Sequence, residues 1–391
     1  MRIESFEFES TQKRWKLSRT KFADLTLLVG VSGVGKTRIL RSLASLSELV
    51  EGNSKPGIKW SVEFSDENAR RCEWSGEFER LKDWEDLSAE FEFMVSTDDE
   101  EAPKKKARIL WEEIRVDGEE LISRRDDRII FNGLPTPKLS PNESVIHLLK
   151  EEDIVRPIAK SFSRVYYTDR AYNDSFSGRF AAFNSEKLVK KFTDIEAVKQ
   201  SSHSALAKLF LAYNLKDRSF DEVEARFIGV FPSVEKVSFA SLKDGDGASF
   251  FGNVAFVEIR EVGVEGSIPQ KDISSGMMRT LSHLAELYLS PRGTVILIDE
   301  FENSLGVNCI NAVTEDLLDS SNSIQFIITS HHPYIINNIS PNYWKVVGRI
   351  GNEVHAVDAS SLDIGASSHD AFLQLINHAV YIQGIDVSVK G

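Results

Sequence analysis

The chain has 391 residues with 41% hydrophobic content, enough for two or three domains or for one elaborated domain of a soluble globular protein. Its formal net charge of −13 argues against nucleic acid wrapped over most of the surface, although a local basic patch is compatible with it. Two distant cysteines, Cys72 and Cys309, argue against a disulfide framework, and no apolar run approaches the ~18 residues of a membrane span, so we expect a cytoplasmic protein.

The first strong signal is a glycine-rich stretch close to the N-terminus. MRIESFEFES alternates apolar and polar residues and predicts a strand rather than a signal peptide. Leu25–Val29 then predicts a buried strand, and helical spacing follows at Ile39, Leu40, Leu43 and Leu46. Between them GVSGVGKT, Gly30 to Thr37, fits G-x-x-x-x-G-K-[ST] in the strand-to-helix context that a phosphate-binding loop requires. An ordinary glycine-rich turn before a helix is the alternative.

The chemistry of this stretch predicts nucleotide binding. Glycines let the backbone approach a phosphate, successive N–H groups face the anion, and the helix N-terminus adds a partial positive charge. Lys36 would reach the β- and γ-phosphates, and the Thr37 hydroxyl would ligate Mg²⁺. The expected nucleotide contacts are Gly30, Val31, Ser32, Gly33, Val34, Gly35, Lys36, Thr37 and Arg38.

Short strands and then helices follow along the chain. An antiparallel meander, leaning on the strand that enters the glycine loop, is predicted from Ile58–Phe64, Arg71–Trp74, Arg108–Val116, Leu121–Arg124 and Arg128–Phe131. Asp117-Gly118 and Asn132-Gly133 are turn signals, and residues 98–106 form a charged loop. A helix over Glu143–Leu149 and a core strand at Val165–Tyr167 precede three apolar stripes at helical spacing, Leu188–Val198, Ala205–Tyr213 and Val223–Val230. Strand alternation returns at Asn253–Val262.

Three motifs in the last third of the chain carry further chemistry. Ser274 is placed to cap a helix whose N-terminus is a potential anion site; taken alone, Ile273–Met277 is a plain capped helix. Thr294–Glu300 is a buried strand that ends in two acids: Asp299 would bind Mg²⁺ through water and Glu300 would accept a proton from the attacking water. Such a strand is weak evidence alone and strong evidence beside the glycine loop.

The third motif is a buried strand, Ile324–Thr329, followed by two histidines. His331 could hydrogen-bond a γ-phosphate, whereas a structural histidine is the plainer alternative. A zinc site lacks a third ligand at suitable spacing.

The order of these motifs resembles that of ATP-binding-cassette (ABC) ATPases. DEFENSL followed by TSHHPYIINNI looks closer to soluble relatives than to transporters. These relatives include the ATPase part of OLD-family (overcoming lysogenization defect) and related bacterial antiphage defence proteins, with SMC-type ATPases as more distant cousins. The resemblance covers residues 1–50 and about 250–350. It implies an α/β ABC-type ATPase head, a P-loop core sheet with an antiparallel β meander, and a helical insertion. The expected domains are 1–145, 146–250 and 251–391.

The resemblance also implies a homodimer, or a higher homo-oligomer, with ATP and Mg²⁺ sandwiched between heads. Glu300, Lys36 and His331 would be catalytic, Thr37 and Asp299 would hold the metal, and Ser274, Ser275 and Gly276 would complete the site of the second copy. Asn303–Leu305 would lie near that interface.

Two departures from the family pattern shape the functional expectation. No glutamine lies between Gln12 and Gln200, so the family's metal-contacting glutamine is replaced; Ser140, Asn142, Glu143 and Ser144 are the candidates. Only about 60 residues follow His331, too few for the TOPRIM nuclease domain of OLD proteins, so a nuclease effector would be a separate chain. The base-contacting residue is open, with Trp15 and Phe22 on the segment to test.

We therefore expect a nucleotide-gated dimeric switch that controls a separate effector in antiphage defence. The alternatives are an SMC-like DNA-repair or DNA-clamping ATPase, the nucleotide-binding subunit of a transporter, and a scaffold that binds ATP without turnover. DNA binding is not supported by the net charge, and no membrane association is expected.

Overall fold

The fold is described from a computed structural model of the chain. It describes residues 1–81, 106–167, 183–242, 254–302, 324–362, 364, 368–378, 381–382 and 384–386. Most of the charged loop at 98–106, Cys309 and the expected interface segment Asn303–Leu305 lie outside the described residues. Within them, no helix is long and apolar enough to cross a membrane.

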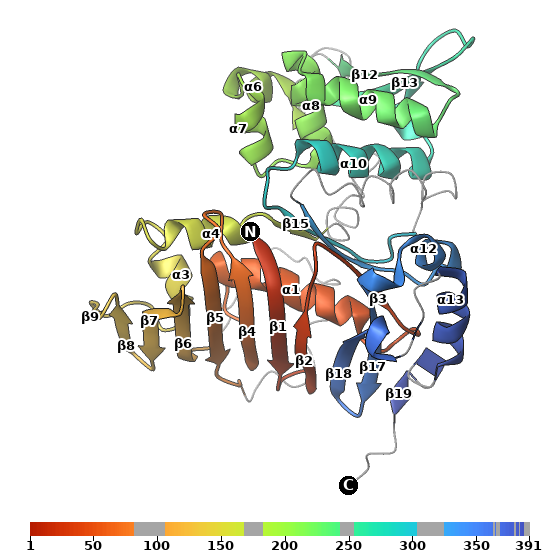
Figure 1. Cartoon of the computed structure of the whole chain (residues 1–391). Coiled ribbons are helices and arrows are strands. Elements are labelled where there is room, and N and C mark those ends of the chain that lie inside the picture. Colours follow the sequence, from red (N-terminus) through yellow and green to blue (C-terminus); the bar gives the residue numbers. More distant parts are fainter. Residues whose placement is uncertain are drawn as a thin grey trace, which may run out of the picture.

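A parallel core of five strands forms one end of a 15-stranded sheet (Figure 1). Its order is β10 (Val165–Tyr167), β15 (Val295–Ile298), β16 (Gln325–Thr329), β3 (Leu25–Val29) and β17 (Trp344–Ile350), each parallel to its neighbour. β3, β15 and β16 are buried along their whole length, as expected for strands covered on both faces. All five strands therefore end at the same edge of the sheet.

The antiparallel meander continues the same sheet, but it does not pair with β3 as predicted. The C-terminal hairpin of β17 and β18 (Glu353–Asp358) stands between them, with β18 parallel to β2 (Trp15–Lys21). The remaining strands, in sheet order, are β1 (Arg2–Ser10), β4 (Ile58–Ser65), β5 (Arg71–Phe78), β6 (Ile109–Val116), β7 (Glu119–Arg125), β8 (Arg128–Phe131) and β9 (Leu134–Pro135), while β19 (Ile385–Asp386) pairs with β17. Both predicted hairpin turns are confirmed, since Asp117, Gly118, Asn132 and Gly133 all have φ between 49° and 88°.

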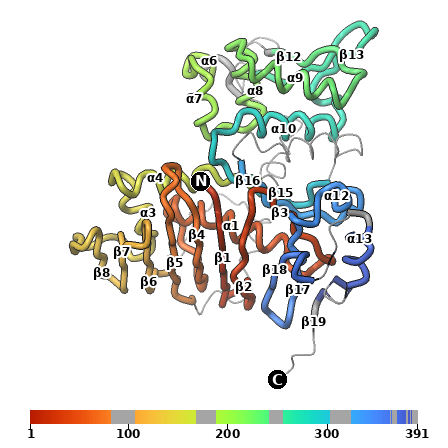
Figure 2. The backbone as a smooth tube through the Cα atoms, in the orientation of Figure 1, coloured from red at the N-terminus to blue at the C-terminus, as the bar shows by residue number. Residues whose placement is uncertain are grey.

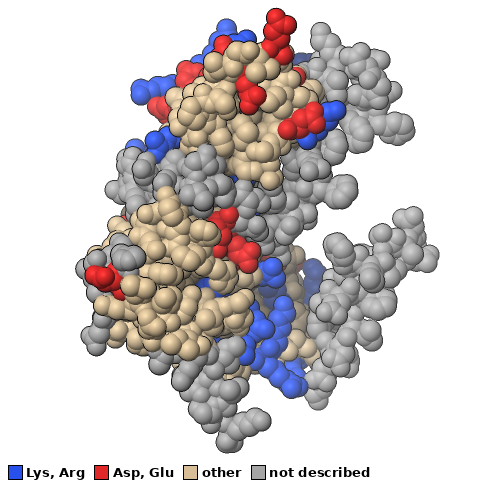
Figure 3. All heavy atoms as spheres, turned by 90° about the vertical axis from the view of Figure 1, so that its right-hand side faces the viewer, with Lys and Arg blue, Asp and Glu red and all other residues tan. Residues whose placement is uncertain are grey.

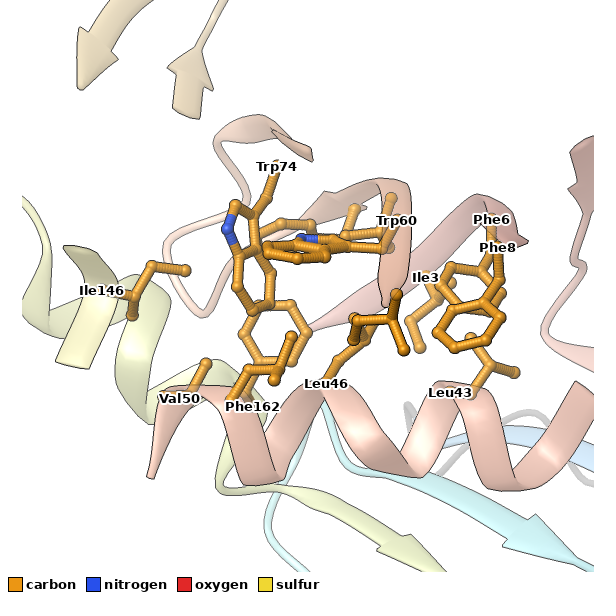
Figure 4. Close-up of a cluster of buried hydrophobic side chains, with 14 of the residues drawn as sticks. Ile3, Phe6, Phe8, Leu43, Leu46, Val50, Trp60, Trp74, Ile146 and Phe162 are labelled. Carbon is orange, nitrogen blue, oxygen red and sulfur yellow. The ribbon is translucent and has the colours of Figure 1, made fainter. Parts of the chain in front are cut away.

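Helix α1 (Lys36–Val50) packs its apolar face on the meander, and Figure 4 shows this core. Leu43 and Leu46 lie against aromatic side chains of the strands. Phe162 of α4 (Arg156–Phe162) stacks edge-on against Trp74, with ring centroids 5.0 Å apart. Each such buried side chain contributes about 1.5–3 kcal/mol to stability. This packing fixes the position of the first turn of α1.

A second layer of helices lies above the core sheet in Figures 1 and 2. It contains α6 (Ser185–Lys191), α7 (Ile195–Gln200), α8 (Ala205–Leu215), α9 (Arg218–Val230) and α10 (Ser275–Leu289). A four-stranded sheet accompanies them: β11 (Phe183–Asn184), β12 (Val234–Leu242), β13 (Val254–Glu261) and β14 (Ile268–Pro269). The insertion is thus α/β and not purely helical. The first predicted stripe is split into two helices because Asp194 caps α7 by accepting a bond from Ala197 N.

Short helical elements complete the described chain. They are α3 (Val145–Leu148), η2 (Gln270–Asp272), α12 (Pro333–Asn338), η4 (Pro341–Tyr343), η5 (Ala359–Leu362) and α13 (Ser368–Asn377). The predicted class, an α/β P-loop core sheet with an antiparallel meander and an inserted helical layer, is confirmed.

The four residues considered as substitutes for the missing glutamine bind the meander instead. The Ser144 hydroxyl donates to Glu112 Oε1 at 2.6 Å, and the Asn142 amide donates to the carbonyls of Lys106 and Ala107, just before β6. Arg124 donates to the carbonyls of Ser140 and Glu143. The loop 140–144 is therefore an anchor for the meander.

Glu112 is the centre of this anchor. Its side chain is fully buried and accepts from Trp74 Nε1, the Ser144 hydroxyl and Val145 N, and burial raises the pKa of its carboxyl group. The donors compensate only in part for the loss of hydration.

Replacing Glu112 with alanine should lower the free energy of unfolding by about 3 kcal/mol, because it leaves buried donors unpaired. Glu113→Ala is the matched control on the same strand, since Glu113 forms surface ion pairs worth about 0–1 kcal/mol. Urea denaturation measures both values, and equal losses in the two variants would contradict the anchoring role.

Candidate active site

The glycine loop joins β3 to α1, as predicted. Two of its three glycines are required by close packing. A Cβ on Gly30 would lie 2.5 Å from the Val347 carbonyl oxygen. Gly35, with φ +114°, caps α1, and a Cβ there would lie 3.0 Å from Val354 Cγ2. The C-terminal hairpin therefore forms the wall behind the loop, and any larger residue at these positions would displace it.

The first turn of α1 presents its backbone N–H groups without a side-chain cap and without an acidic residue. The first N–H groups of a helix have no partner within the helix, so this end is suited to bind an anion. Ser32 and Gly33 are exposed beside it, while Val34 is buried and holds the loop to the core.

Lys36 lies inside the loop with only 5% of its surface exposed. Its ammonium group donates to the carbonyls of Gly30 at 2.7 Å and Val31 at 3.0 Å. Burial lowers the pKa of Lys36 to about 8, an effect opposed by the negative charges of Asp299, Glu302 and Glu300, in that order. The lysine is therefore a desolvated cation that gains strongly from a phosphate ligand.

The two predicted acids follow β15 directly, and they differ in environment. Asp299 is buried, and its Oδ1 accepts from Thr37 Oγ1 at 3.1 Å and Thr329 Oγ1 at 2.7 Å. Glu300 is exposed and has a left-handed φ of 49°, a conformation uncommon outside glycine. Its backbone N–H donates to Thr329 Oγ1 at 2.8 Å, which holds the turn. One threonine thus positions both acids.

The pair Thr37 and Asp299 fits a magnesium ion. Both offer oxygen ligands, and they lie within hydrogen-bond distance of each other at the end of the loop. Magnesium prefers oxygen and usually takes only one or two protein ligands, leaving its other positions to phosphates and water.

His331 follows β16 and lies on the same side of the loop. Its Nδ1 is 3.4 Å from Lys36 Nζ, and its backbone N–H donates to Glu302 Oε1 at 2.6 Å. An ammonium group can only donate, so Nδ1 is the acceptor and the neutral ring carries its proton on Nε2. That N–H is the group that could donate to a phosphate oxygen.

The Ser274–Gly276 corner stands apart from these residues. Ser274 caps α10 by accepting from Met277 N, as predicted, and both Ser274 and Ser275 are exposed. Among the described contacts, no hydrogen bond or ion pair joins this corner to the glycine loop or to the acids of its own chain.

The two aromatic candidates for base contact are both buried. Phe22 packs into the core under the meander, and Trp15 packs against Phe8 with ring centroids 5.3 Å apart. The Arg38 guanidinium lies over the Trp15 ring at 6.0 Å, so Arg38 and not the indole is the exposed group there.

Sequence reasoning gave no role to three residues of this site: Thr329, Glu302 and Tyr167. The Tyr167 hydroxyl lies 3.4 Å from Asp299 Oδ2 and also contacts Arg41 Nε at 3.5 Å. The strand-end position of Thr329 beside the acids was a usable signal, because parallel strands end at one edge. The role of Tyr167 could be found only by knowing that β10 pairs with β15.

Fold and loop together define a P-loop ATPase domain. A family described as "AAA domain, putative AbiEii toxin, Type IV TA system" matches residues 25–337, and the chain belongs to it. Among curated proteins none matches this sequence.

Three solved SMC head structures are similar to the chain. An SMC head bound to the C-terminal winged-helix domain of ScpA has 13% identity and a TM-score of 0.46, covering 91% of this chain and 97% of that one. The SMC head domain from Thermotoga maritima has 13% identity and a TM-score of 0.42, covering 92% and 99%. The SMC head from Pyrococcus furiosus, with an extended coiled coil and a bound ScpA C-terminal domain, has 14% identity and a TM-score of 0.38, covering 91% and 96%.

Replacing Thr329 with valine should lower kcat for ATP hydrolysis by at least tenfold and destabilise the chain by about 1–3 kcal/mol. The change keeps the shape but leaves Asp299 with one donor fewer and the Glu300 N–H unpaired. Thr294→Val is the control, because Thr294 is equally buried and donates only to the Pro291 carbonyl. Steady-state turnover and urea denaturation test this, and equal turnover in both variants would refute the role of Thr329.

Binding of Mg-ADP should take up protons at pH 8.5 and none at pH 6.5. The pKa of Lys36 is about 8 in the free chain, so the amine is largely neutral at pH 8.5, and a phosphate favours the ammonium form. Calorimetry in buffers of different ionisation enthalpy measures the uptake. His331→Ala should retain it, and uptake that is absent at pH 8.5 or lost in His331→Ala would exclude Lys36 as its source.

Proposed function

We propose that the chain binds ATP with Mg²⁺ and hydrolyses it, and that two copies close around the nucleotide. The observation that carries this proposal is the hydrogen-bonded set of Thr37, Asp299 and Thr329 at the end of the glycine loop. Lys36, which donates to two carbonyls of the loop, and His331 lie beside it. Its residue types and distances match the requirements of a triphosphate with its metal.

In this proposal each side chain has one task. Lys36 binds the β- and γ-phosphates, and Thr37 with Asp299 would hold Mg²⁺, which supplies positive charge to the phosphate oxygens. Glu300 accepts a proton from the attacking water, and the Nε2–H of His331 donates to the γ-phosphate. General-base catalysis of this kind contributes about 10²–10⁴-fold in rate.

The exposure of Ser274 and Ser275 at the start of α10 supports dimer closure. A single copy leaves bound ATP open to water, whereas a second copy would add the N–H groups of the first turn of its α10 and exclude solvent. A two-fold axis satisfies both sites at once. Closure would depend on ATP because the γ-phosphate reaches across the interface.

We further propose that closure controls a separate effector, a nuclease in the simplest case, in bacterial antiphage defence. The family description names a toxin of a toxin–antitoxin system, which by its name has two components. The division into domains 1–145, 146–250 and 251–391 and the cytoplasmic location remain predictions from the sequence.

Glu300→Gln should form a stable dimer with ATP while kcat falls by at least 10²-fold. The amide cannot accept the proton, yet it leaves the binding groups in place. Lys36→Ala is the paired control and should neither bind ATP nor dimerise. Light scattering with ATP, ADP or no nucleotide measures the mass, and one unchanged mass in all three conditions would end the switch proposal.

A DNA-clamping role is the second candidate. Figure 3 shows Lys and Arg side chains gathered on the lower half of one face, despite the net charge of −13. Tight duplex binding that weakens steeply with salt would favour this role over effector control.

A further inference from the structure

The turn after β15 brings a third acid, Glu302, back to the neighbouring strand end. Phe301 is fully buried, and its N–H donates to the Thr329 carbonyl at 2.9 Å, which anchors the turn. Glu302 Oε1 then accepts the backbone N–H of His331 at 2.6 Å. The backbone of His331, whose ring faces Lys36, is therefore held by the side chain of Glu302 and not by a backbone carbonyl.

The second oxygen of Glu302 is buried, and no described residue donates to it. A buried carboxylate oxygen without a donor costs about 1–3 kcal/mol. Residues that only stabilise a turn rarely carry such a cost, so the position of this carboxylate needs another explanation.

Glu302, His331 and Lys36 form a closed arrangement. Glu302 holds the His331 backbone, the His331 ring lies 3.4 Å from the Lys36 ammonium, and Glu302 adds its negative charge near the same lysine. Glu300, in contrast, is exposed, and its backbone N–H is bonded to Thr329. The two glutamates therefore occupy different environments although they are two residues apart.

We propose that Glu302 is a positioning residue that acts through His331: its carboxylate oxygen fixes the loop after β16 so that the imidazole meets the terminal phosphate. The inference rests on the proposed ATPase function and deepens it. Glu302 itself exchanges no proton with the attacking water and binds no metal. For this positioning role the reach of its side chain and the presence of an acceptor oxygen are decisive, and its charge, one of three near Lys36, is secondary.

Two variants of similar size separate the effect of side-chain length at position 302 from the effect of its charge. Glu302→Gln keeps the reach and an acceptor oxygen but loses the charge, so kcat should stay within about threefold of the parent. Glu302→Asp keeps the charge but is one methylene shorter, so the bond to His331 N is lost and kcat should fall at least tenfold. A base or a metal ligand requires the opposite order, and that order would overturn the proposal.

A double-mutant cycle tests whether Glu302 acts through His331. Glu302→Asp combined with His331→Ala should be no slower than His331→Ala alone, within about threefold, because the ring that the carboxylate positions is gone. Multiplied losses would overturn the proposal. KM for ATP should change less than threefold in every variant, because the loop and Lys36 still bind the nucleotide.

The control is Glu353→Ala, a half-buried glutamate that accepts from the Ser18 hydroxyl on the meander, and it should leave kcat unchanged. Failure of the two proposals is distinguishable. No turnover by the parent chain would end the proposed function, whereas parent turnover with the Gln and Asp variants in the wrong order would end only this inference.

Discussion

The site depends on keeping a buried ammonium group charged. Lys36 is almost fully removed from water, and an isolated charge there would be very costly. Two loop carbonyls and three nearby carboxylates compensate, but burial still dominates its pKa. An ammonium group in this state is poised for a stronger anionic partner, because the site has already desolvated it. The rest of the fold places the groups that would bind such an anion beside Lys36.

That geometry comes from the parallel core. Strands that run in one direction end at one edge, so β15 and β16 deliver Asp299 and Thr329 to the same place where β3 delivers the glycine loop. The bond between Thr329 and Asp299 then ties two strand ends into one unit, and the bond from Thr329 to Glu300 N extends it to the second acid. Side-chain hydrogen bonds therefore hold the ends of β15 and β16 together.

The sequence predicted what is local and missed what depends on strand order. A glycine loop between strand and helix, and acids directly after an apolar run, are read within about 15 residues of chain, and the fold class followed from their order. The hairpin β17–β18 separates β3 from the meander by pairing Glu353 with Lys16, which no periodicity reveals. β12 was missed because a register shift between Val234 and Lys236 breaks its alternation.

The missing glutamine illustrates the same limit. Its four candidates were chosen from a loop that precedes α3, yet the structure places them on the meander. Asp299 is instead contacted by β10, the strand at the edge of the core, because the Tyr167 hydroxyl lies next to the Asp299 carboxylate. Finding it from sequence required the pairing of residue 167 with residue 297, more than a hundred positions away.

β10 is also where the site meets the helical layer. The Arg164 guanidinium, directly before the strand, donates to the Gln200 side chain at the end of α7. The Lys208 ammonium of α8 lies over the Tyr166 ring, 5.6 Å from its centroid. Tyr167 contacts Asp299. Successive residues of a strand point to opposite faces, so one short strand contacts Asp299 on one side and the inserted helices on the other. α10, which Ser274 caps, belongs to the same layer of helices.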